Sequence, residues 1–453
     1  MDPLPLHDIA RMAGAEIFRG SGDAVVSRVG KDSRTIQPGD LYIALRGDHF
    51  DGNAFGADAA SRGAAAVLLD SPEAAVGLPE GFPVLLADGG QAALTRLAAA
   101  WRDRLALKVL CITGSNGKTS TKDFAAAVLG ARFKVTKTQG NLNNHIGLPL
   151  SILAAGSTHT AAVWEIGMSH PGEVGPLAAL ARPDAAIITN IGVAHIEYMK
   201  SRRAIAIEKG ALAEAVPPSG FVVLSASDDQ SDGIAARCKA RVLRTGFSSG
   251  AVTASSMEEG EDSCSFVLHA AGKTLGAKIP CHGTHMVANA LQAVAAGLEF
   301  GVSPQEAAAA LAKAHLTGGR LERRTIRGIS FLDDTYNASP DSMVAALATL
   351  RALPGSGHRI AILGRMGELG EHAAEGYRQA GLAAGKYADI LVVVGAETAP
   401  LAEAARAAGL DRIHEVEDAA SAVRMLTQLA KPGDIVLVKG SRSAKMEDVF
   451  KIF

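Results

Sequence analysis

The segment at residues 111–120, CITGSNGKTS, constrains the fold more than any other part of this chain. The apolar, partly β-branched run KVLCIT at 108–113 predicts a buried strand before it, and a helix is predicted at 119–129 after it. A glycine-containing turn between a strand and a helix is typical of a phosphate-binding loop. The loop departs from the common pattern G-x-x-x-x-G-K-[ST], because Ile112 stands at the first glycine and Gly114 comes two residues late.

The residues of this loop suit a bound nucleotide. Gly114 and Gly117 allow a tight backbone turn that aims N–H groups at an anion, and the helix N-terminus adds a partial positive charge. Lys118 would reach the β- and γ-phosphates, and the Thr119 hydroxyl would hold Mg²⁺. The alternative is a surface turn with a stray lysine. The predicted nucleotide-binding segment comprises Gly114, Ser115, Asn116, Gly117, Lys118, Thr119 and Ser120.

Composition narrows the class of protein. The chain has 453 residues, of which 48% are hydrophobic and 20% charged, and this length is enough for two to four domains. A formal net charge of −2 and 4% aromatic residues give no indication of binding to nucleic acid or to an anionic membrane. The start, MDPLPLHDIARMAG, does not resemble a signal peptide, and no apolar run predicts a membrane span. Four scattered cysteines are expected to be reduced thiols of a cytoplasmic protein.

Three blocks of the chain are expected to form three α/β domains. Block 1–105 predicts a small mixed α/β domain, and block 106–321 alternates strands and helices as in a largely parallel sheet. Block 322–453 repeats that alternation and predicts a Rossmann-like, doubly wound domain. The other predicted strands lie at 41–45, 64–69, 162–166, 185–189, 221–224, 360–363, 390–394 and 434–438. Predicted helices include 91–105, 204–215, 285–300 and 419–429.

Two polar residues follow successive predicted strands of the second block. Glu165 comes after AVW, and His195 comes after AAIITN. The carboxyl ends of parallel strands face the ligand crevice of such a sheet. A carboxylate there suits Mg²⁺, which prefers oxygen ligands. The alternatives are a solvated loop glutamate and a histidine whose hydrogen bonds are satisfied within a loop or the core.

Motifs along nearly the whole chain resemble those of the Mur ligases and of their folylpolyglutamate synthase relatives. The phosphate loop TGSNGKT is similar to the ATP loop of that family, whose first glycine has the same late position. The remaining motifs occur in the family's order and are GNLNNHIG (140–147), EIGM (165–168), NIGVAH (190–195), KG (209–210), HMVANA (285–290), GRL (319–321), DDTYN (333–337) and VKGSRS (438–443). GNLNNHIG, DDTYNASPDSM and GRMGELGE are most similar to segments of the ligase that handles D-alanyl-D-alanine.

The resemblance implies an ATP-dependent ligase that joins D-alanyl-D-alanine to UDP-N-acetylmuramoyl-tripeptide through an acyl phosphate, in peptidoglycan precursor synthesis. It implies that the first block binds the UDP end of the substrate. We expect the protein to be a monomer. Another ligase of the same fold is a near alternative, either a diamino-acid-adding Mur ligase or folylpolyglutamate synthase. DSRTIQPGDLYIALRG argues against the second, which lacks a uridine-binding domain. A non-catalytic nucleotide-binding module is the far alternative.

The resemblance also implies roles for single residues. Two Mg²⁺ ions would be bound by Thr119, Glu165, His195 and Lys209, the last as N6-carboxylysine, made by reaction with CO₂. Asn289 would bind adenine, Arg320 the γ-phosphate, and Asp334 the ribose. The expected catalytic residues are Lys118, Glu165, His195, Lys209 and Arg320. The expected substrate-binding residues are Ser33, Arg34, Asn141, Asn143, Asn144, Tyr336, Asn337, Lys439, Ser441 and Arg442.

Overall fold

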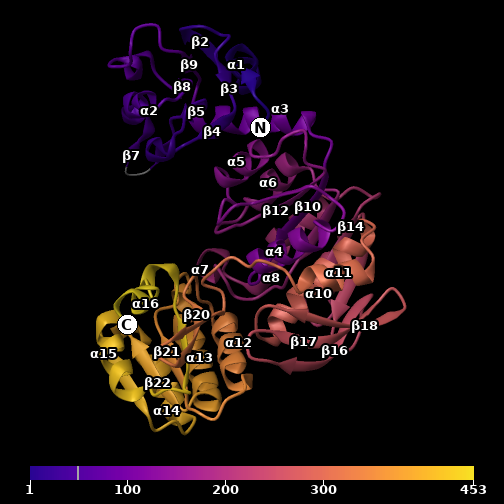
Figure 1. Ribbon diagram of the computed structural model, residues 1–453, viewed down its shortest axis with the longest axis vertical. Coiled ribbons are helices and arrows are strands. Elements are labelled where there is room, and N and C mark those ends of the chain that lie inside the picture. Colours follow the sequence, from indigo (N-terminus) through magenta and orange to yellow (C-terminus); the bar gives the residue numbers. More distant parts are fainter. Residues whose placement is uncertain (48–49) are drawn as a thin grey trace. The chain divides into compact units, whose positions relative to one another are not determined.

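The computed structural model describes residues 1–47 and 50–453, which group into two compact units. Figure 1 follows the chain by colour from the N-terminus to the C-terminus. Unit 1 comprises Met1–Cys111, Phe133–Met168 and Glu173–Asp184, and unit 2 comprises Ile112–Arg132, Ser169–Gly172 and Ala185–Phe453. All four cysteines are free, as their spacing predicted. None of the helices in the described part of the chain has both the length and the apolar character needed to span a bilayer.

The N-terminal part of unit 1 is built on a five-stranded sheet of order β2-β9-β8-β5-β4. Only the β2–β9 pair is antiparallel, as expected of a small mixed α/β domain. Central strands β5 and β8 are buried along their whole length, which is typical of parallel strands covered on both faces. The strands are β2 (Glu16–Arg19), β4 (Arg28–Gly30), β5 (Asp40–Ile43), β8 (Ala66–Leu69) and β9 (Val84–Leu86), and the helices α1 (Leu6–Ala13), α2 (Gly56–Ser61) and α3 (Gly90–Arg104).

Helix α3 links the first sequence block to the second within unit 1. The indole N–H of Trp101 donates to the carbonyl of Ala155 at 2.9 Å, and Nε of Arg102 donates to the carbonyl of Ala181 at 2.9 Å. Arg102 is buried and lies over the ring of Trp164. Its charge is therefore satisfied by backbone carbonyls and an aromatic face instead of a carboxylate.

The middle part of the sequence contains a nine-stranded sheet of order β11-β12-β10-β13-β14-β15-β16-β17-β18. The strands are β10 (Lys108–Thr113), β11 (Val135–Lys137), β12 (Ala161–Glu165), β13 (Ala185–Ile188), β14 (Phe221–Ser225), β15 (Arg241–Gly246), β16 (Val252–Glu259), β17 (Cys264–Ala270) and β18 (Lys273–Ile279). The accompanying helices include α4 (Lys118–Leu129), α5 (Gly147–Leu153), α6 (Val174–Ala181), α7 (Ile196–Met199), α8 (Arg202–Glu214), α10 (Thr284–Glu299) and α11 (Pro304–Leu311).

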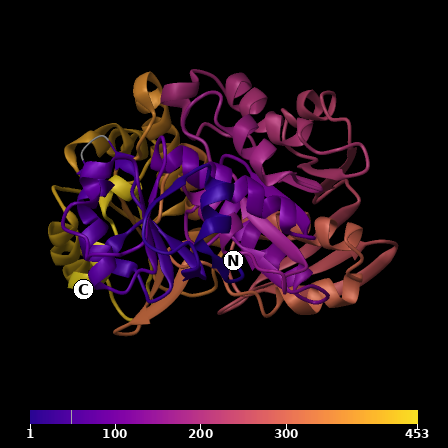
Figure 2. The same ribbon diagram turned by 90° about the horizontal axis from the view of Figure 1, so that it is seen from above.

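The prediction of a parallel sheet needs a correction at one edge. β13 to β16 pair in parallel, but β17 pairs antiparallel with both β16 and β18. Buried and more exposed residues alternate along β17, because an antiparallel strand can have one face toward the core and the other toward water. Figures 1 and 2 show these strands in the salmon-coloured part of the chain.

The C-terminal part of unit 2 contains a six-stranded sheet of order β19-β20-β24-β21-β22-β23. β19 and β20 form an antiparallel pair, and the other pairs are parallel, which agrees with the predicted Rossmann-like domain. The strands are β19 (Glu322–Ile326), β20 (Ile329–Asp334), β21 (Arg359–Leu363), β22 (Ile390–Val394), β23 (Ile413–Val416) and β24 (Ile435–Lys439). The helices include α12 (Pro340–Ala352), α13 (Ala373–Tyr387), α14 (Ala399–Ala407) and α15 (Ala419–Leu429).

Candidate active site

The loop between β10 and α4 contains two glycines that its close contacts require. Gly114 has a φ of +151° and Gly117 a φ of +79°. A Cβ atom on Gly114 would lie 1.8 Å from Oγ1 of Thr189, and one on Gly117 would lie 2.5 Å from Oδ1 of Asn289. Ile112, at the usual first-glycine position, is fully buried in β10. The turn therefore begins only after the strand ends, and this explains the late first glycine.

Asn190, at the end of the next strand segment, holds the shape of this loop. Its carbonyl accepts the N–H of Ser115 at 2.9 Å, and its Oδ1 accepts the N–H of Asn116 at 3.1 Å. Nζ of Lys118 donates back to the carbonyl of Gly114 at 2.9 Å. The loop thus presents a fixed turn, a lysine amine folded over it, and the N-terminus of α4.

Lys209, on α8, has an amine that is fully buried. Its Nζ has no hydrogen-bond partner among the described residues. Burial lowers the pKa of this amine well below its ordinary value, the charge of Lys118 lowers it further, and Glu208 opposes the shift. A buried ammonium without a partner is costly, so burial disfavours the charged form of this amine.

His195 contacts a residue of the C-terminal sheet domain. Its Nδ1 lies 2.5 Å from a carboxylate oxygen of Glu368, in the loop after β21. The proximity and charge of His195 lower the pKa of Glu368. Glu368 belongs to the segment GRMGELGE, which resembles a segment of the family, but its contact with His195 was not predicted. The only available signal was that segment, because nothing local links it to His195.

Two further hydrogen bonds join the start of α12 to the loops after β10 and β13. The hydroxyl of Ser339 donates to Oδ1 of Asn116 at 3.0 Å, and the N–H of Val193 donates to a carboxylate oxygen of Asp341 at 3.0 Å. Ser339 and Asp341 were also missed by the sequence analysis. Their contacts place the C-terminal sheet domain directly against the phosphate loop within unit 2.

The expected adenine and γ-phosphate residues also lie in unit 2. Asn289 is buried on α10 and packs against Gly117, as the close approach of its amide shows. The guanidinium of Arg320 stacks on the ring of Tyr336 at 4.0 Å from the centroid. Its Nε is buried without a hydrogen-bond partner among the described residues. Stacking fixes the plane of the Arg320 guanidinium, and its Nε–H is left as a donor for a bound ligand.

Asp334, the expected ribose ligand, is paired with the expected dipeptide ligand Lys439. The amine of Lys439 lies 2.5 Å from a carboxylate oxygen of Asp334 and 2.9 Å from the carbonyl of Asn337. Lys439 is buried, so its positive charge is already neutralised inside the protein. A role in substrate binding would require this pair to rearrange.

The residues after β24 face different surroundings. Ser441 is buried, and its N–H donates to the carbonyl of Arg365 at 2.8 Å. Arg442 is exposed and pairs with Glu447 at 2.9 Å. Of the two expected substrate-binding cations in this segment, Lys439 is buried against Asp334 and Arg442 is exposed beside Glu447.

Glu165 and the predicted asparagines lie in unit 1. The amide of Asn143 donates to Oε1 of Glu165 at 2.8 Å, so this asparagine orients the carboxylate at the end of β12. Asn144 uses its Oδ1 to accept the N–H of Gly147 at 2.9 Å, at the start of α5. Asn141 is exposed. One of the three asparagines therefore supports Glu165, and another supports a helix.

Ser33 and Arg34 belong to a short 3-10 turn in the N-terminal part of unit 1. Arg34 pairs with Asp32 at 2.7 Å and lowers the pKa of that carboxyl to about 2. Ser33 is buried and hydrogen-bonds Asp58, whose pKa it lowers. Both predicted uridine-end residues are hydrogen-bonded within the domain.

No cluster of three or more His, Cys, Asp or Glu side chains suited to a metal ion occurs at residues 1–47 and 50–453. The expected ligand set contains only two such residues, Glu165 and His195. It would also need the Thr119 hydroxyl and a modified Lys209, so its occupation stays a prediction.

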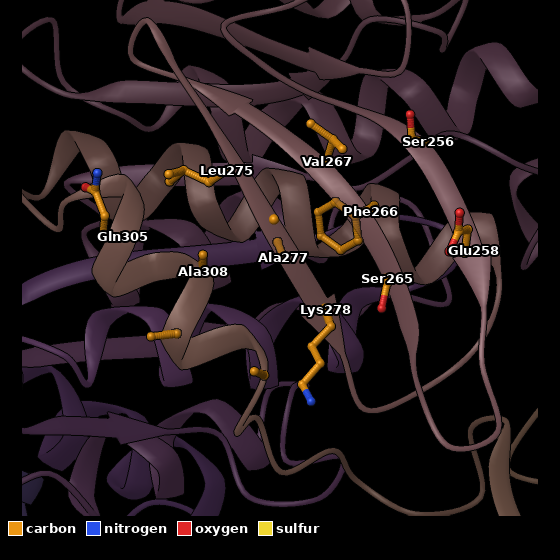
Figure 3. A pocket seen from close by; sticks show the side chains of 13 residues that line it. Ser256, Glu258, Ser265, Phe266, Val267, Leu275, Ala277, Lys278, Gln305 and Ala308 are labelled. Atoms are coloured by element: carbon orange, nitrogen blue, oxygen red, sulfur yellow. The ribbon is translucent and has the colours of Figure 1, made fainter.

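A separate groove of about 760 Å³ lies between β16–β18 and α11. Figure 3 shows Phe266 and Val267 from β17, Leu275 and Lys278 from β18, and Gln305 from α11 around it. None of the predicted site residues lines this groove, and we assign it no role.

Comparison with known proteins matches three family models along the chain. They are the Mur ligase family catalytic domain at 25–88, the Mur ligase middle domain at 112–297, and the Mur ligase glutamate ligase domain at 319–442. UDP-N-acetylmuramoyl-tripeptide--D-alanyl-D-alanine ligase from Bacillus subtilis is 37% identical over 430 residues, covering 94% of this chain and 93% of its own.

Solved structures agree with these matches. MurF from Acinetobacter baumannii has a TM-score of 0.89 and 29% identity, covering 100% of this chain and 98% of its own. MurF ligase from Thermotoga maritima, solved in complex with ADP, has a TM-score of 0.82 and 26% identity, covering 94% of this chain and 97% of its own.

Proposed function

The chain belongs to the Mur ligase family, and from that premise we propose how its residues join D-alanyl-D-alanine to UDP-N-acetylmuramoyl-tripeptide. It is an ATP-dependent ligase of peptidoglycan synthesis. The observation that carries the residue assignments is Lys209, a buried amine without a partner in the same unit as the phosphate loop. We further propose that the enzyme acts as a monomer in the cytoplasm, where nucleotide-linked precursors are available.

The proposed nucleotide site is the loop Gly114–Ser120 with residues of α10 and the C-terminal domain. Lys118 binds the β- and γ-phosphates, Asn289 binds adenine, and Asp334 binds the ribose. Arg320 is proposed to donate hydrogen bonds from its guanidinium to the γ-phosphate. Its buried Nε, which has no hydrogen-bond partner among the described residues, supports this role. Phosphoryl transfer depends mainly on such positioning and charge neutralisation.

Lys209 fits the proposed Mg²⁺ site only after modification. Its neutral amine has a lone pair that attacks the carbon of CO₂, an N–C bond forms, and one proton leaves to give a carbamate anion. A carbamate at Lys209 would offer oxygen donors to Mg²⁺ in unit 2, together with the Thr119 hydroxyl and the His195 imidazole, and Glu165 is the further oxygen ligand that the family resemblance implies. Bound Mg²⁺ would supply neutralisation of the charge on the transferring phosphoryl group.

The chemistry of the ligation follows from these assignments. ATP transfers its γ-phosphoryl to the terminal carboxylate of the tripeptide, which gives an acyl phosphate and ADP. The amine of D-alanyl-D-alanine attacks the acyl carbon, phosphate leaves, and one proton is lost as the amide forms. Ser33 and Arg34 are proposed to bind the uridine end of the substrate, and Asn141, Asn143 and Asn144 are proposed to bind the muramoyl peptide. The residues proposed to bind on the dipeptide side are Tyr336, Asn337, Lys439, Ser441 and Arg442.

A substrate panel tests this function directly. ADP release should require both UDP-N-acetylmuramoyl-tripeptide and an amine, and D-alanyl-D-alanine should be used far better than D-alanine or L-alanine. Faster turnover with a shorter UDP-muramoyl precursor and D-glutamate, L-lysine or diaminopimelate would assign the chain to another member of the fold. Nucleotide binding without ADP release under any condition would favour a non-catalytic module.

A further inference from the structure

Glu368 is the residue of the C-terminal sheet domain that reaches His195. His195 lies between β13 of the nine-stranded sheet and α7, and Glu368 lies in the segment that follows β21 of the six-stranded sheet. The carboxylate and Nδ1 of the imidazole are 2.5 Å apart. The two atoms are in ion-pair contact without the alignment of a hydrogen bond, and since Nδ1 faces the carboxylate, Nε2 is the ring nitrogen left to bind a metal ion.

The backbone on both sides of this contact is constrained. His195 has a φ of +64° and Glu368 a φ of +59°, and neither residue is a glycine. The carbonyl of Glu368 also accepts the N–H of Glu197 at 3.2 Å. A Cβ atom on Gly370 would lie 2.9 Å from Cγ of Glu197, so the two loops approach closely at a glycine.

Stability alone does not account for this arrangement. The side chain of Glu368 is 41% exposed, and a partly exposed ion pair adds little to stability. Left-handed conformations of residues other than glycine cost free energy, and they cluster at active sites, ligand clamps and switch regions. The two strained residues are those whose side chains meet.

We propose that Glu368 is a positioning residue that orients His195 for the metal site. A histidine that binds a metal commonly donates its other ring N–H to a carboxylate, which fixes the tautomer and the ring direction. Here the carboxylate belongs to the C-terminal domain, so the position of that domain determines how well His195 is oriented. This inference rests on the proposed role of His195 as a metal ligand.

Binding of Mn²⁺ to the full-length protein with saturating ADP tests the inference without turnover. Glu368→Ala should weaken the affinity for Mn²⁺ by about 10- to 100-fold, the usual effect of losing such a partner. Glu368→Gln should lose less of the affinity for Mn²⁺, because its amide oxygen can still accept a hydrogen bond from Nδ1–H of His195. Glu371→Gln is the matched control, since Glu371 is an exposed glutamate in the short 3-10 helix that follows Glu368, and the affinity of this variant should equal that of the wild type.

Two results separate the possible failures. If His195→Ala binds Mn²⁺ as the wild type does, His195 is not a metal ligand, and that part of the proposed function fails together with this inference. If His195→Ala loses Mn²⁺ but Glu368→Ala does not, only the role of Glu368 is overturned. An equal loss of ADP affinity by Glu368→Ala in the absence of metal would also overturn it, because the contact would then act on the nucleotide site as a whole.

Discussion

Lys209 on α8 and Lys439 at the end of β24 are both buried, but their amines have different neighbours. Nζ of Lys209 has no hydrogen-bond partner in the described part of the chain, and burial lowers its pKa. Nζ of Lys439 contacts Asp334 at 2.5 Å and the carbonyl of Asn337 at 2.9 Å. Burial therefore does not by itself decide what a lysine does. Burial without a partner disfavours the charged form of the Lys209 amine, whereas the amine of Lys439 is held by Asp334 and Asn337.

The largest expected effect is the loss of ligation in Lys209→Ala. Removing the proposed carbamate should lower the rate of ADP formation by about 100-fold or more, the scale of one preorganised charge-stabilising group. Added acetate or propionate should restore part of the rate by occupying the space of the side chain. Ligation by Lys209→Ala at the wild-type rate would contradict a reactive role for Lys209 that Lys439 lacks.

The next effect concerns stability and belongs to Lys439. Lys439→Ala leaves Asp334 without its cation in a mostly buried position, which should lower the free energy of unfolding by about 3–5 kcal/mol. Urea denaturation measures this change. The double variant Lys439→Met, Asp334→Asn should recover part of the loss, because no uncompensated charge remains. An unchanged midpoint for Lys439→Ala would show that the pair does not hold the domain together.

Lys209→Met should raise the free energy of unfolding, whereas Lys439→Ala should lower it. Methionine replaces a buried amine that makes no hydrogen bond, so the free energy of unfolding should rise by about 1–3 kcal/mol. Denaturation should be measured without bicarbonate or nucleotide, to keep the amine unmodified. Destabilisation by this substitution would indicate that Lys209 has a favourable partner in the folded protein.

The smallest effect is expected for Arg442, whose pair with Glu447 is exposed. Arg442→Ala should change the free energy of unfolding by less than about 1 kcal/mol. If Arg442 also binds the carboxylate of the acceptor, the KM for D-alanyl-D-alanine should rise while kcat changes less. An unchanged KM would leave Lys439 and Ser441 as the remaining candidates near the end of β24.

Much of the fold could be predicted because local patterns determine it. β10, β22 and α15 have the predicted bounds, since each combines a continuous apolar run or helical period with clear turn signals. The antiparallel β17 and β18 were not predicted, although buried and more exposed residues alternate along β17, because their pairing depends on neighbouring strands that no single segment specifies. The phosphate loop was predicted because the residues expected to contact the phosphates are consecutive in the sequence.

The surroundings of the two lysines could not be predicted in the same way. Lys209 and Lys439 each occur in a short motif, and nothing in either motif states whether a carboxylate will lie beside the amine. The partner of Lys439 comes from β20, and the carboxylate beside His195 comes from the loop after β21. Such contacts depend on the packing of segments far apart in sequence, which local propensity does not specify.

The central claim is that Lys209 is a neutral amine that reacts with CO₂, and ¹³C NMR of the protein with ¹³C-labelled bicarbonate, Mg²⁺ and ADP tests it most directly. The account predicts a protein carbamate resonance that is present in the wild type, disappears in Lys209→Ala and persists in Lys439→Met. Absence of any carbamate resonance in the wild type, or a resonance that survives in Lys209→Ala, would contradict it.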